Sequence, residues 1–268
     1  MKDKVVIITG ASSGIGKALA ENFAERNAKI VLAARSLDKL KELESRLKVK
    51  ASGILTVKTD VSREEDCLNL IKKTVEKFGT INILINNAGI SMRAVFQDVD
   101  LSVIKQLMDI NFWGTVYCTK FALPYLLKSK GSVVGVSSIA GYKGLPGRAG
   151  YSASKFAMQG FLEVLRIENI KKELHVLIAC PGFTTSNIRN TALAADGSRQ
   201  GESPRNEVKM MSAEEVAKRI IKAIEKRKDR LTLTTQGKLT VTLNKFFPKF
   251  MDKMVYNHMA KEADSPFK

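Results

Sequence analysis

The segment YSASK, residues 151–155, places a phenol and an ammonium four residues apart at the point where a helical pattern begins. Side chains with this spacing lie on one face of a helix. A tyrosine hydroxyl has an ordinary pKa of about 10, and a neighbouring cation lowers that pKa because it stabilises the phenolate. We therefore predict that Tyr151 is a general acid/base and that Lys155 lowers its pKa. Taken alone the pattern is weak, because an exposed tyrosine beside a solvated lysine has the same spacing.

A glycine-rich turn, TGASSGIG, occupies residues 9–16 between an expected strand and an expected helix. Glycine permits a tight turn and lets backbone N–H groups approach a pyrophosphate, and the helix N-terminus adds the positive end of its dipole. The spacing is GxxxGxG rather than the general GxGxxG. The residues predicted to contact a dinucleotide in this turn are Gly10, Ser12, Ser13, Gly14, Ile15 and Gly16.

The end of the second expected strand carries no carboxylate. It reads AARS over residues 33–36, whereas NAD-binding folds usually place an acidic residue there for the ribose 2′-hydroxyl. The guanidinium of Arg35 can fork onto a phosphate. We therefore expect NADP(H) to be preferred over NAD(H), with Arg35 and Ser36 as contacts. The alternative interpretation is that Arg35 is an exposed residue of the turn.

Short β-branched runs alternate with amphipathic stretches, which predicts βαβ units and a parallel sheet. The fold class is α/β, a single doubly wound Rossmann sheet of about seven strands with helices on both faces. The expected strands are residues 5–9, 29–33, 53–58, 81–85, 132–136, 175–179 and 231–234. The expected helices are residues 15–26, 37–47, 64–78 with Ser62 as N-cap, 101–127, 151–172 and 213–227.

Further polar residues fall at the carboxyl ends of the expected strands, where open α/β sheets bind ligands. The carboxylate of Asp60 is placed to meet an adenine amino group, and Ser138 follows the fifth strand, thirteen residues before the tyrosine. Asn111 interrupts a long apolar helix and is either a local kink or a functional group. The cofactor contacts predicted at these strand ends are Asp60, Val61, Asn87, Ala88 and Gly89.

This set of motifs in this order resembles the short-chain dehydrogenase/reductase family over roughly residues 5–235. The resemblance rests on TGASSGIG, Asp60, NNAG, Asn111, Ser138, YSASK and Pro181-Gly182. It implies that Tyr151 is the catalytic acid/base, that Lys155 also binds the nicotinamide ribose, that Ser138 polarises the substrate carbonyl, and that Asn111 holds a water in a proton relay. The segment after strand six resembles the family's PGxxxT, with Ser186 in the threonine position, which implies cofactor contacts at Pro181, Gly182, Thr184 and Ser186.

Residues 187–211 are polar and match the family's variable substrate lid in position. Apolar residues nearby predict a pocket for a bulky hydrophobic ketone or alcohol rather than a sugar. The residues expected to line it are Tyr142, Leu145, Pro146, Phe183 and Ile188.

The chain continues beyond a catalytic domain expected over residues 1–235 into an amphipathic helical extension over residues 236–268. Pro248 suits the first turn of a new helix. An apolar stripe there runs through Phe247, Phe250, Met251, Met254, Val255 and Met259, and a mostly basic row runs through Lys249, Lys253, Asn257 and Lys261. Such a helix covers the substrate pocket, packs on another subunit, or lies in a membrane interface through residues 238–261. The resemblance extends to this tail, because hydroxysteroid-dehydrogenase-like members carry membrane-associated helices after the last strand.

Composition and charge narrow the range of partners, metal sites and cellular compartments that the sequence allows. The net charge of +17 is read as a solvated basic surface, because most lysines lie among acidic residues at helix-surface spacings, and no basic motif with interleaved aromatics indicates nucleic acid. Three isolated cysteines suggest buried thiols in a reducing compartment, hence a cytoplasmic or membrane-peripheral protein.

The two histidines are too far apart in the sequence to indicate a metal site. No apolar run reaches the roughly 20 residues of a membrane span, and no signal peptide is expected at the start.

The expected activity is NADP(H)-dependent hydride transfer to or from a lipophilic ketone or secondary alcohol. One alternative is a reductase of 3-oxoacyl groups on a carrier protein or coenzyme A, and a remoter one is a catalytically silent regulatory protein that binds the cofactor. The resemblance implies a homodimer or homotetramer formed through the long helices 101–127 and 151–172. Apolar positions there agree with this, although monomer packing would leave the same pattern.

Overall fold

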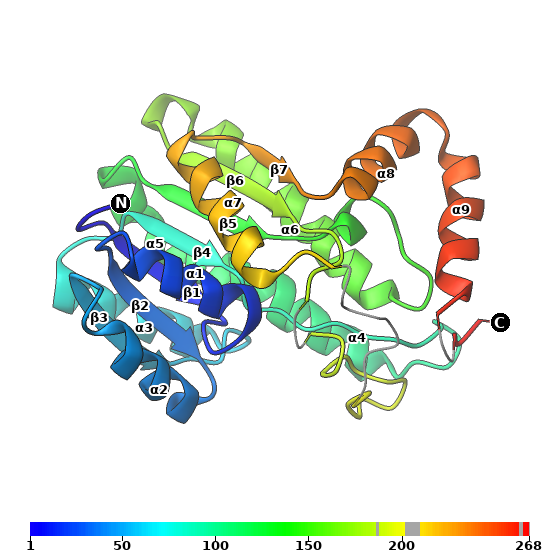
Figure 1. The fold of residues 1–268 in the computed structure, drawn as a ribbon, viewed down its shortest axis with the longest axis horizontal. Coiled ribbons are helices and arrows are strands. Elements are labelled where there is room, and N and C mark those ends of the chain that lie inside the picture. Colours follow the sequence, from blue (N-terminus) through cyan, green and yellow to red (C-terminus); the bar gives the residue numbers. More distant parts are fainter. Residues whose placement is uncertain (186–187, 202–209, 263–264, 268) are drawn as a thin grey trace.

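The computed structural model describes residues 1–185, 188–201, 210–262 and 265–267. A seven-stranded sheet forms its centre, with strand order β3-β2-β1-β4-β5-β6-β7 and parallel pairing throughout (Figure 1). The order reverses between β1 and β4, so the doubly wound sheet expected from the sequence is confirmed. The strands are β1 Val5–Thr9, β2 Lys29–Ala34, β3 Gly53–Lys58, β4 Ile83–Asn86, β5 Ser132–Val136, β6 His175–Cys180 and β7 Arg230–Thr232.

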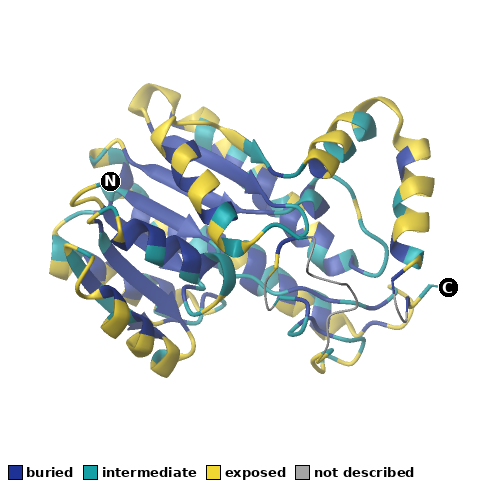
Figure 2. Ribbon diagram, viewed as in Figure 1, coloured by how far each residue is buried: buried dark blue, intermediate teal, exposed yellow. Residues whose placement is uncertain are grey.

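Helices cover both faces of the sheet, and the central strands are buried throughout (Figure 2). One face packs against α1 (Gly14–Ala24), α2 (Leu37–Leu47) and α7 (Ala213–Glu225), and the other against α3 (Glu64–Phe78), α5 (Gly114–Lys128) and α6 (Ala149–Glu168). Strands buried on both faces have continuous apolar runs, as VVIIT in β1 does. Each helix buries one apolar stripe, so burial of side chains such as Phe23 and Leu162 positions the helices on the sheet.

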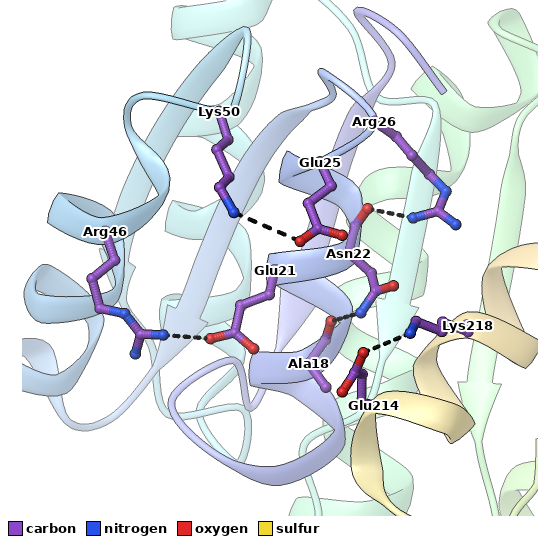
Figure 3. Close-up of polar contacts among 9 residues, drawn as sticks. All are labelled: Ala18, Glu21, Asn22, Glu25, Arg26, Arg46, Lys50, Glu214 and Lys218. Carbon is purple, nitrogen blue, oxygen red and sulfur yellow. Dashed lines mark hydrogen bonds and ion pairs between the residues drawn. The ribbon is translucent and has the colours of Figure 1, made fainter.

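Ion pairs add surface links around α1 (Figure 3). Glu21 pairs with Arg46 of α2 at 3.0 Å, and Glu25 pairs with Lys50 at 3.7 Å. On the neighbouring α7, Lys218 pairs with Glu214 one turn away. The side chains of these pairs are 31% to 64% exposed, so each pair contributes at most about 1 kcal/mol and orients α1 less than its buried face does.

The long helix expected over residues 101–127 is one helical run with an irregular centre. It comprises α4 (Leu101–Leu107), a π-helical turn over Met108–Trp113, and α5. A π-turn adds a residue to one turn of a helix and is common at functional sites. Asn111 lies inside this turn, so the sequence interruption corresponds to a change in helix type.

The expected N-cap of α3 is wrong. Arg63 holds the N-cap position, and Ser62 instead donates its hydroxyl hydrogen to Asp60 Oδ1 at 2.7 Å. The same carboxylate oxygen accepts the backbone N–H of Ser62 at 3.1 Å, which closes a turn two residues long. The Ser62 hydroxyl is therefore used in the turn with Asp60 and does not cap α3.

The cysteines are free and buried, as expected, but two of them are not isolated. The sulfur atoms of Cys67 and Cys118 lie 3.4 Å apart where α3 packs against α5. This contact with Cys67, and after it burial, raises the pKa of the Cys118 thiol well above its ordinary value. Both side chains therefore act as small apolar groups in the helix–helix contact.

Two helices follow β7, namely α8 (Thr235–Phe246) and α9 (Pro248–Ala260), and Pro248 begins α9 as expected. They leave the sheet beside its carboxyl edge, and α9 descends toward α4 at one end of the molecule (Figure 1). The side-chain oxygen of Thr234 caps α8 by accepting the N–H of Gly237 at 3.0 Å. Among the described residues, no helix is long and apolar enough to cross a bilayer.

Candidate active site

A cavity of about 700 Å³ opens at the carboxyl ends of the strands. It is continuous from the glycine turn after β1 to the helices α8 and α9. Most of the residues predicted to bind a cofactor line it. These are Gly10, Ser12, Ser13, Gly14, Ile15, Arg35, Ser36, Asp60, Val61, Asn87, Ala88, Gly89, Tyr151, Lys155, Pro181, Gly182 and Thr184, and Ser138, which is predicted to be catalytic, lines the cavity as well.

The glycine turn is braced from the neighbouring strand. The Asn87 side chain donates to the carbonyl oxygens of Thr9 at 2.9 Å and Gly10 at 3.3 Å. Gly16 packs so closely that an added Cβ would lie 2.2 Å from the Gly10 carbonyl oxygen. Gly16 does not itself line the cavity, so its role is to let α1 approach the turn. Gly10 has a φ of 64° and needs the freedom of glycine.

One end of the cavity is cationic. Arg35 follows β2 and Lys39 lies on the first turns of α2, and both side chains are exposed along the cavity wall. Asp60 lines the same end and already accepts two hydrogen bonds from Ser62. Sequence reasoning missed Lys39, although its position four residues after Arg35 on the adjoining helix was a usable signal.

Tyr151 and Ser138 meet in the middle of the cavity. They come from the start of α6 and the end of β5, and Ser138 lies close enough to the phenol to lower its pKa as a hydrogen-bond donor. Burial raises the pKa of Tyr151 above its ordinary value, and the hydrogen bond with Ser138 and the charges of Arg148 and Arg189 lower it in part. The net direction is upward, opposite to the expected lowering by Lys155.

Lys155 is buried and its ammonium group lies elsewhere than expected. Its Nζ donates to the carbonyl oxygen of Val136 at 2.9 Å and lies 5.8 Å from the centre of the Tyr151 ring. Burial lowers the pKa of Lys155 to about 8. The cation therefore contacts the face of the phenol rather than its hydroxyl.

Asn111 is fully buried behind the cavity and does not line it. Its amide nitrogen donates to Ile90 O at 3.0 Å and to Ser154 Oγ at 2.9 Å, and its side-chain oxygen accepts the N–H of Ile90 at 2.9 Å. An added Cβ on Gly89 would lie 3.1 Å from that oxygen and 3.5 Å from Lys155 Nζ. The side chain thus joins the π-turn, the loop after β4 and α6 behind the lysine.

The far end of the cavity is largely apolar. Leu145, Phe183 and Ile188 line it, as predicted. Tyr142 and Pro146 do not: the Tyr142 hydroxyl accepts a hydrogen bond from Arg230, and Pro146 faces a separate surface hollow beside α9. The expectation for these two is corrected because the loop after β5 packs Tyr142 against the core and directs Pro146 to that hollow. Ser186 lies outside the described residues.

The tail forms one wall of the cavity. From the sequence, covering the pocket is one of three interpretations of this helix, beside packing on another subunit and lying in a membrane interface. Met251 and Met259 of α9 are each 1% exposed and line the cavity, so this helix covers the pocket. The predicted stripe is divided, because Phe247 and Phe250 are exposed. Sequence reasoning also missed Arg148 and Arg189, which line the cavity near Tyr151.

Comparison with known proteins agrees with this geometry. Residues 4–196 match the family pattern described as short chain dehydrogenase. The chain is 36% identical over 262 residues to the dehydrogenase/reductase SDR family protein 7-like of Dictyostelium discoideum, covering 95% of this chain and 81% of that protein. It is 40% identical over 223 residues to the 11-beta-hydroxysteroid dehydrogenase-like 4A of Arabidopsis thaliana, covering 82% of this chain and 73% of that protein.

Solved structures show the same fold. A short chain dehydrogenase/reductase from Burkholderia phymatum in complex with NAD superposes with a TM-score of 0.82, at 24% identity, covering 93% of this chain and 95% of that one. An alcohol dehydrogenase from Thermococcus sibiricus, complexed with 5-hydroxy-NADP, superposes with a TM-score of 0.75 at 24% identity, covering 86% of this chain and 94% of that one.

Proposed function

Because this chain belongs to the short-chain dehydrogenase/reductase family, in its hydroxysteroid-dehydrogenase-like branch, we propose that it is an NADP(H)-dependent oxidoreductase for lipophilic ketones and secondary alcohols. The family membership makes it an oxidoreductase that acts on CH–OH groups. The observation that carries the finer proposal is the single cavity, which joins a glycine turn and a cationic end to Tyr151, Ser138 and an apolar wall.

The residues at the cationic end fit a dinucleotide. Gly10 and Gly16 let the turn pack closely against its neighbours, since an added Cβ would lie 2.9 Å from Ala88 Cα at Gly10 and 2.2 Å from the Gly10 carbonyl oxygen at Gly16, and Gly10 itself lines the cavity. Arg35 and Lys39 provide positive charge where β2 ends, and no acidic side chain lines that strand end among the described residues. This charge suits a 2′-phosphate and supports NADP(H) over NAD(H). When bound, the nicotinamide supplies the hydride donor or acceptor.

Side chains of the protein carry out the proton transfer. In carbonyl reduction the Tyr151 hydroxyl donates its proton to the substrate oxygen, and in alcohol oxidation the phenolate takes it back. The Ser138 hydroxyl, next to the phenol in the cavity, holds the substrate oxygen beside it. The ammonium of Lys155 stabilises negative charge on the ring from within the protein, and Asn111 fixes the helix segment behind it. Both roles use groups that are held in place before substrate binds.

The apolar wall supports the choice of substrate. Leu145, Phe183, Ile188, Met251 and Met259 surround the space next to Tyr151. Methionine side chains adapt to irregular apolar shapes, so the wall suits a bulky hydrocarbon body. A small polyol would leave these surfaces poorly covered.

Replacing Tyr151 by Phe tests the assignment. The substitution removes one oxygen atom and should lower kcat for NADPH-dependent ketone reduction by about 10²–10⁴-fold. The Kd for NADPH, measured by fluorescence titration, should stay within about twofold. Tyr125→Phe, a partly buried tyrosine of α5, is the matched control. Ketone reduction by the Tyr151→Phe enzyme at the native rate would refute the mechanism.

We propose in addition that the outer surface of the tail contacts membranes. An exposed apolar surface, called here the tail patch, consists of Phe246, Phe247, Phe250 and Tyr256, none of which lines the cavity. Lys238, Lys245, Lys249 and Lys253 are exposed on the same two helices. Aromatic and basic side chains together favour the interface of an anionic bilayer. The free cysteines support a reducing compartment, so we place the protein in the cytoplasm or on its membrane surfaces.

We also propose a homodimer or homotetramer. Phe156, Val164 and Ile167 are exposed on α6, and Trp113 is exposed at the adjoining end of α5. Large apolar side chains on a helix surface are typical of subunit interfaces.

A further inference from the structure

Just after α9 the chain returns to the start of α6, the helix that carries Tyr151. Glu262, two residues beyond α9, directs its carboxylate at two arginines from distant parts of the sequence. Its Oε2 lies 3.5 Å from the NH2 of Arg148 and 3.6 Å from the Nε of Arg93. The side chains are 4% exposed for Glu262 and 10% for each arginine. Ion pairs this deeply buried differ from surface pairs, because removing one partner leaves an uncompensated charge.

Backbone hydrogen bonds also join the chain segments that carry Glu262, Arg93 and Arg148. The N–H of Ala94 donates to Gly147 O at 3.0 Å, and the N–H of Arg93 donates to Leu193 O at 2.8 Å. Glu262 itself is held by a hydrogen bond from its N–H to Met259 O at 3.1 Å. The loop after β4, the described part of the lid, the start of α6 and the tail therefore converge on one point.

Arg148 connects this cluster to Tyr151. It occupies the N-cap position of α6, and its carbonyl oxygen accepts the N–H of Ser152 at 2.8 Å in the turn that carries Tyr151. Its side chain lines the cavity, and its charge acts on the Tyr151 hydroxyl. A cation at a helix N-terminus opposes the helix dipole, and the carboxylate of Glu262 offsets that cost.

We propose that Glu262 is a positioning residue for proton transfer: by holding Arg148, it sets both where the first turn of α6 lies and how much positive charge reaches Tyr151. The tail then does more than cover the pocket, because the acid/base is complete only when the tail is docked. This inference rests on the proposed role of Tyr151 as acid/base.

Other groups act on the same hydroxyl and must be held constant. Burial of the phenol raises its pKa, the hydrogen bond from Ser138 and the charges of Arg148 and Arg189 lower it, and Cys180 raises it. Lys155 lies over the ring, and Arg199 and His258 line the same cavity. None of these is changed in the experiment below.

The proposal is tested by the pKa of Tyr151, which should shift in opposite directions in Glu262→Gln and Arg93→Gln. The readout is the ultraviolet absorbance of tyrosinate during an alkaline titration, with the matching Tyr151→Phe background subtracted, so that neither cofactor nor substrate is needed. Glu262→Gln removes the negative charge that offsets Arg148, so the Tyr151 pKa should fall by a few tenths of a unit to about one unit. Arg93→Gln removes a competitor for the carboxylate, which then neutralises Arg148 more fully, so the Tyr151 pKa should rise. Glu262→Asp keeps the charge and should stay near the native value.

Kinetics and a control on α9 complete the test. Glu262→Gln should lower kcat/KM for ketone reduction about tenfold, through misplacement of the first turn of α6, while the Kd for NADPH stays within about twofold. Asp252→Asn removes a carboxylate from the same tail, one that pairs with Lys143 at 2.5 Å, and should leave the Tyr151 titration unchanged. Circular dichroism establishes that each variant is folded.

Shifts of the same sign in Glu262→Gln and Arg93→Gln would overturn the proposal, as would an equal shift in Asp252→Asn. Failure of the proposed function looks different: the titration shifts would persist in an enzyme whose ketone reduction does not depend on Tyr151.

Discussion

Tyr151 and Lys155 share a face of α6, yet their relation is not that of a phenol whose hydroxyl is held by an ammonium. The lysine amine donates to Val136 O, and its charge lies over the aromatic ring. Desolvation is the largest influence on both groups, and it raises the pKa of the phenol and lowers that of the amine, because burial disfavours each charged form. The two ionisations, which lie close together in free tyrosine and lysine, are therefore moved apart, and the amine loses its proton at a lower pH than the phenol does.

The lowered pKa of Lys155 predicts a pH dependence. With a pKa of about 8, the ammonium is present below that pH and is lost above it. We expect kcat for ketone reduction at saturating NADPH to fall as the pH rises through about 8. In Lys155→Arg the cation does not titrate in this range, so that fall should disappear, even though the bulkier side chain lowers the rate at every pH. An unchanged alkaline fall in Lys155→Arg would mean that another group is responsible.

Arg35 governs the proposed cofactor preference. A charge-assisted hydrogen bond contributes about 1.5–3 kcal/mol, so Arg35→Ala should weaken NADPH binding about 10–100-fold and change NADH binding little. Isothermal titration calorimetry with both cofactors measures this. The matched control is Arg46→Ala, since Arg46 is an exposed arginine of α2 that pairs with Glu21 and does not line the cavity (Figure 3). A loss of equal size for NADPH and NADH would contradict the assignment to the 2′-phosphate.

Among the elements, α9 has two apolar surfaces with different partners. Its inner residues Met251 and Met259 line the cavity, whereas the tail patch faces outward with exposed fractions of 70% for Phe246 and 56% for Phe250. Phenylalanines this exposed contribute nothing to the core of the described protein. Their retention beside lysines is the reason for proposing a membrane contact.

The tail patch can be altered without disturbing the pocket. The triple variant Phe246→Ser, Phe247→Ser, Phe250→Ser should pellet with anionic phosphatidylserine vesicles several-fold less than the native chain, because it loses the apolar surface that inserts into the interface. Co-sedimentation at low and high salt measures both the apolar and the electrostatic contributions. Phe96→Ser, at a phenylalanine 66% exposed elsewhere on the surface, is the control. Equal pelleting of native and triple-variant protein would rule out this contact.

At the scale of the whole molecule, α6 belongs to the active site and to the proposed subunit interface at once. Its inner side carries Lys155 and the core residue Leu162, and its outer side exposes Phe156, Val164 and Ile167. Docking of two α6 helices would restrain the helix that carries Tyr151, the proposed acid/base. Assembly and activity should therefore be linked.

A charge on the outer side of α6 tests this link. Val164→Glu should shift the protein toward monomer in size-exclusion chromatography with light scattering, because a buried, unpaired carboxylate opposes association. Val49→Glu adds the same charge at a valine that is 86% exposed after α2 and should leave the assembly unchanged. A native chain that is already monomeric at the concentrations of the activity assay would contradict the proposed oligomer.

The sequence alone was sufficient for the order and type of nearly all elements. Strands such as β1 and β5 are continuous apolar runs, and a run buried on both faces has few alternatives to a central parallel strand. The positions of Gly10 and Tyr151 at the cavity could also be anticipated, because residues that follow parallel strands must meet at one edge of the sheet.

Tertiary structure decided what depends on contacts between segments far apart in the chain. Lys155 lies over the ring while its amine donates to Val136 O, and α9 is joined to the loop after β5 by the ion pair of Lys143 with Asp252. The pairing of Glu262 with Arg93 and Arg148 has no signal in local sequence. Periodicity and turn chemistry act over a few residues, whereas burial, and with it the pKa of each catalytic group, is set by the packing of the whole chain.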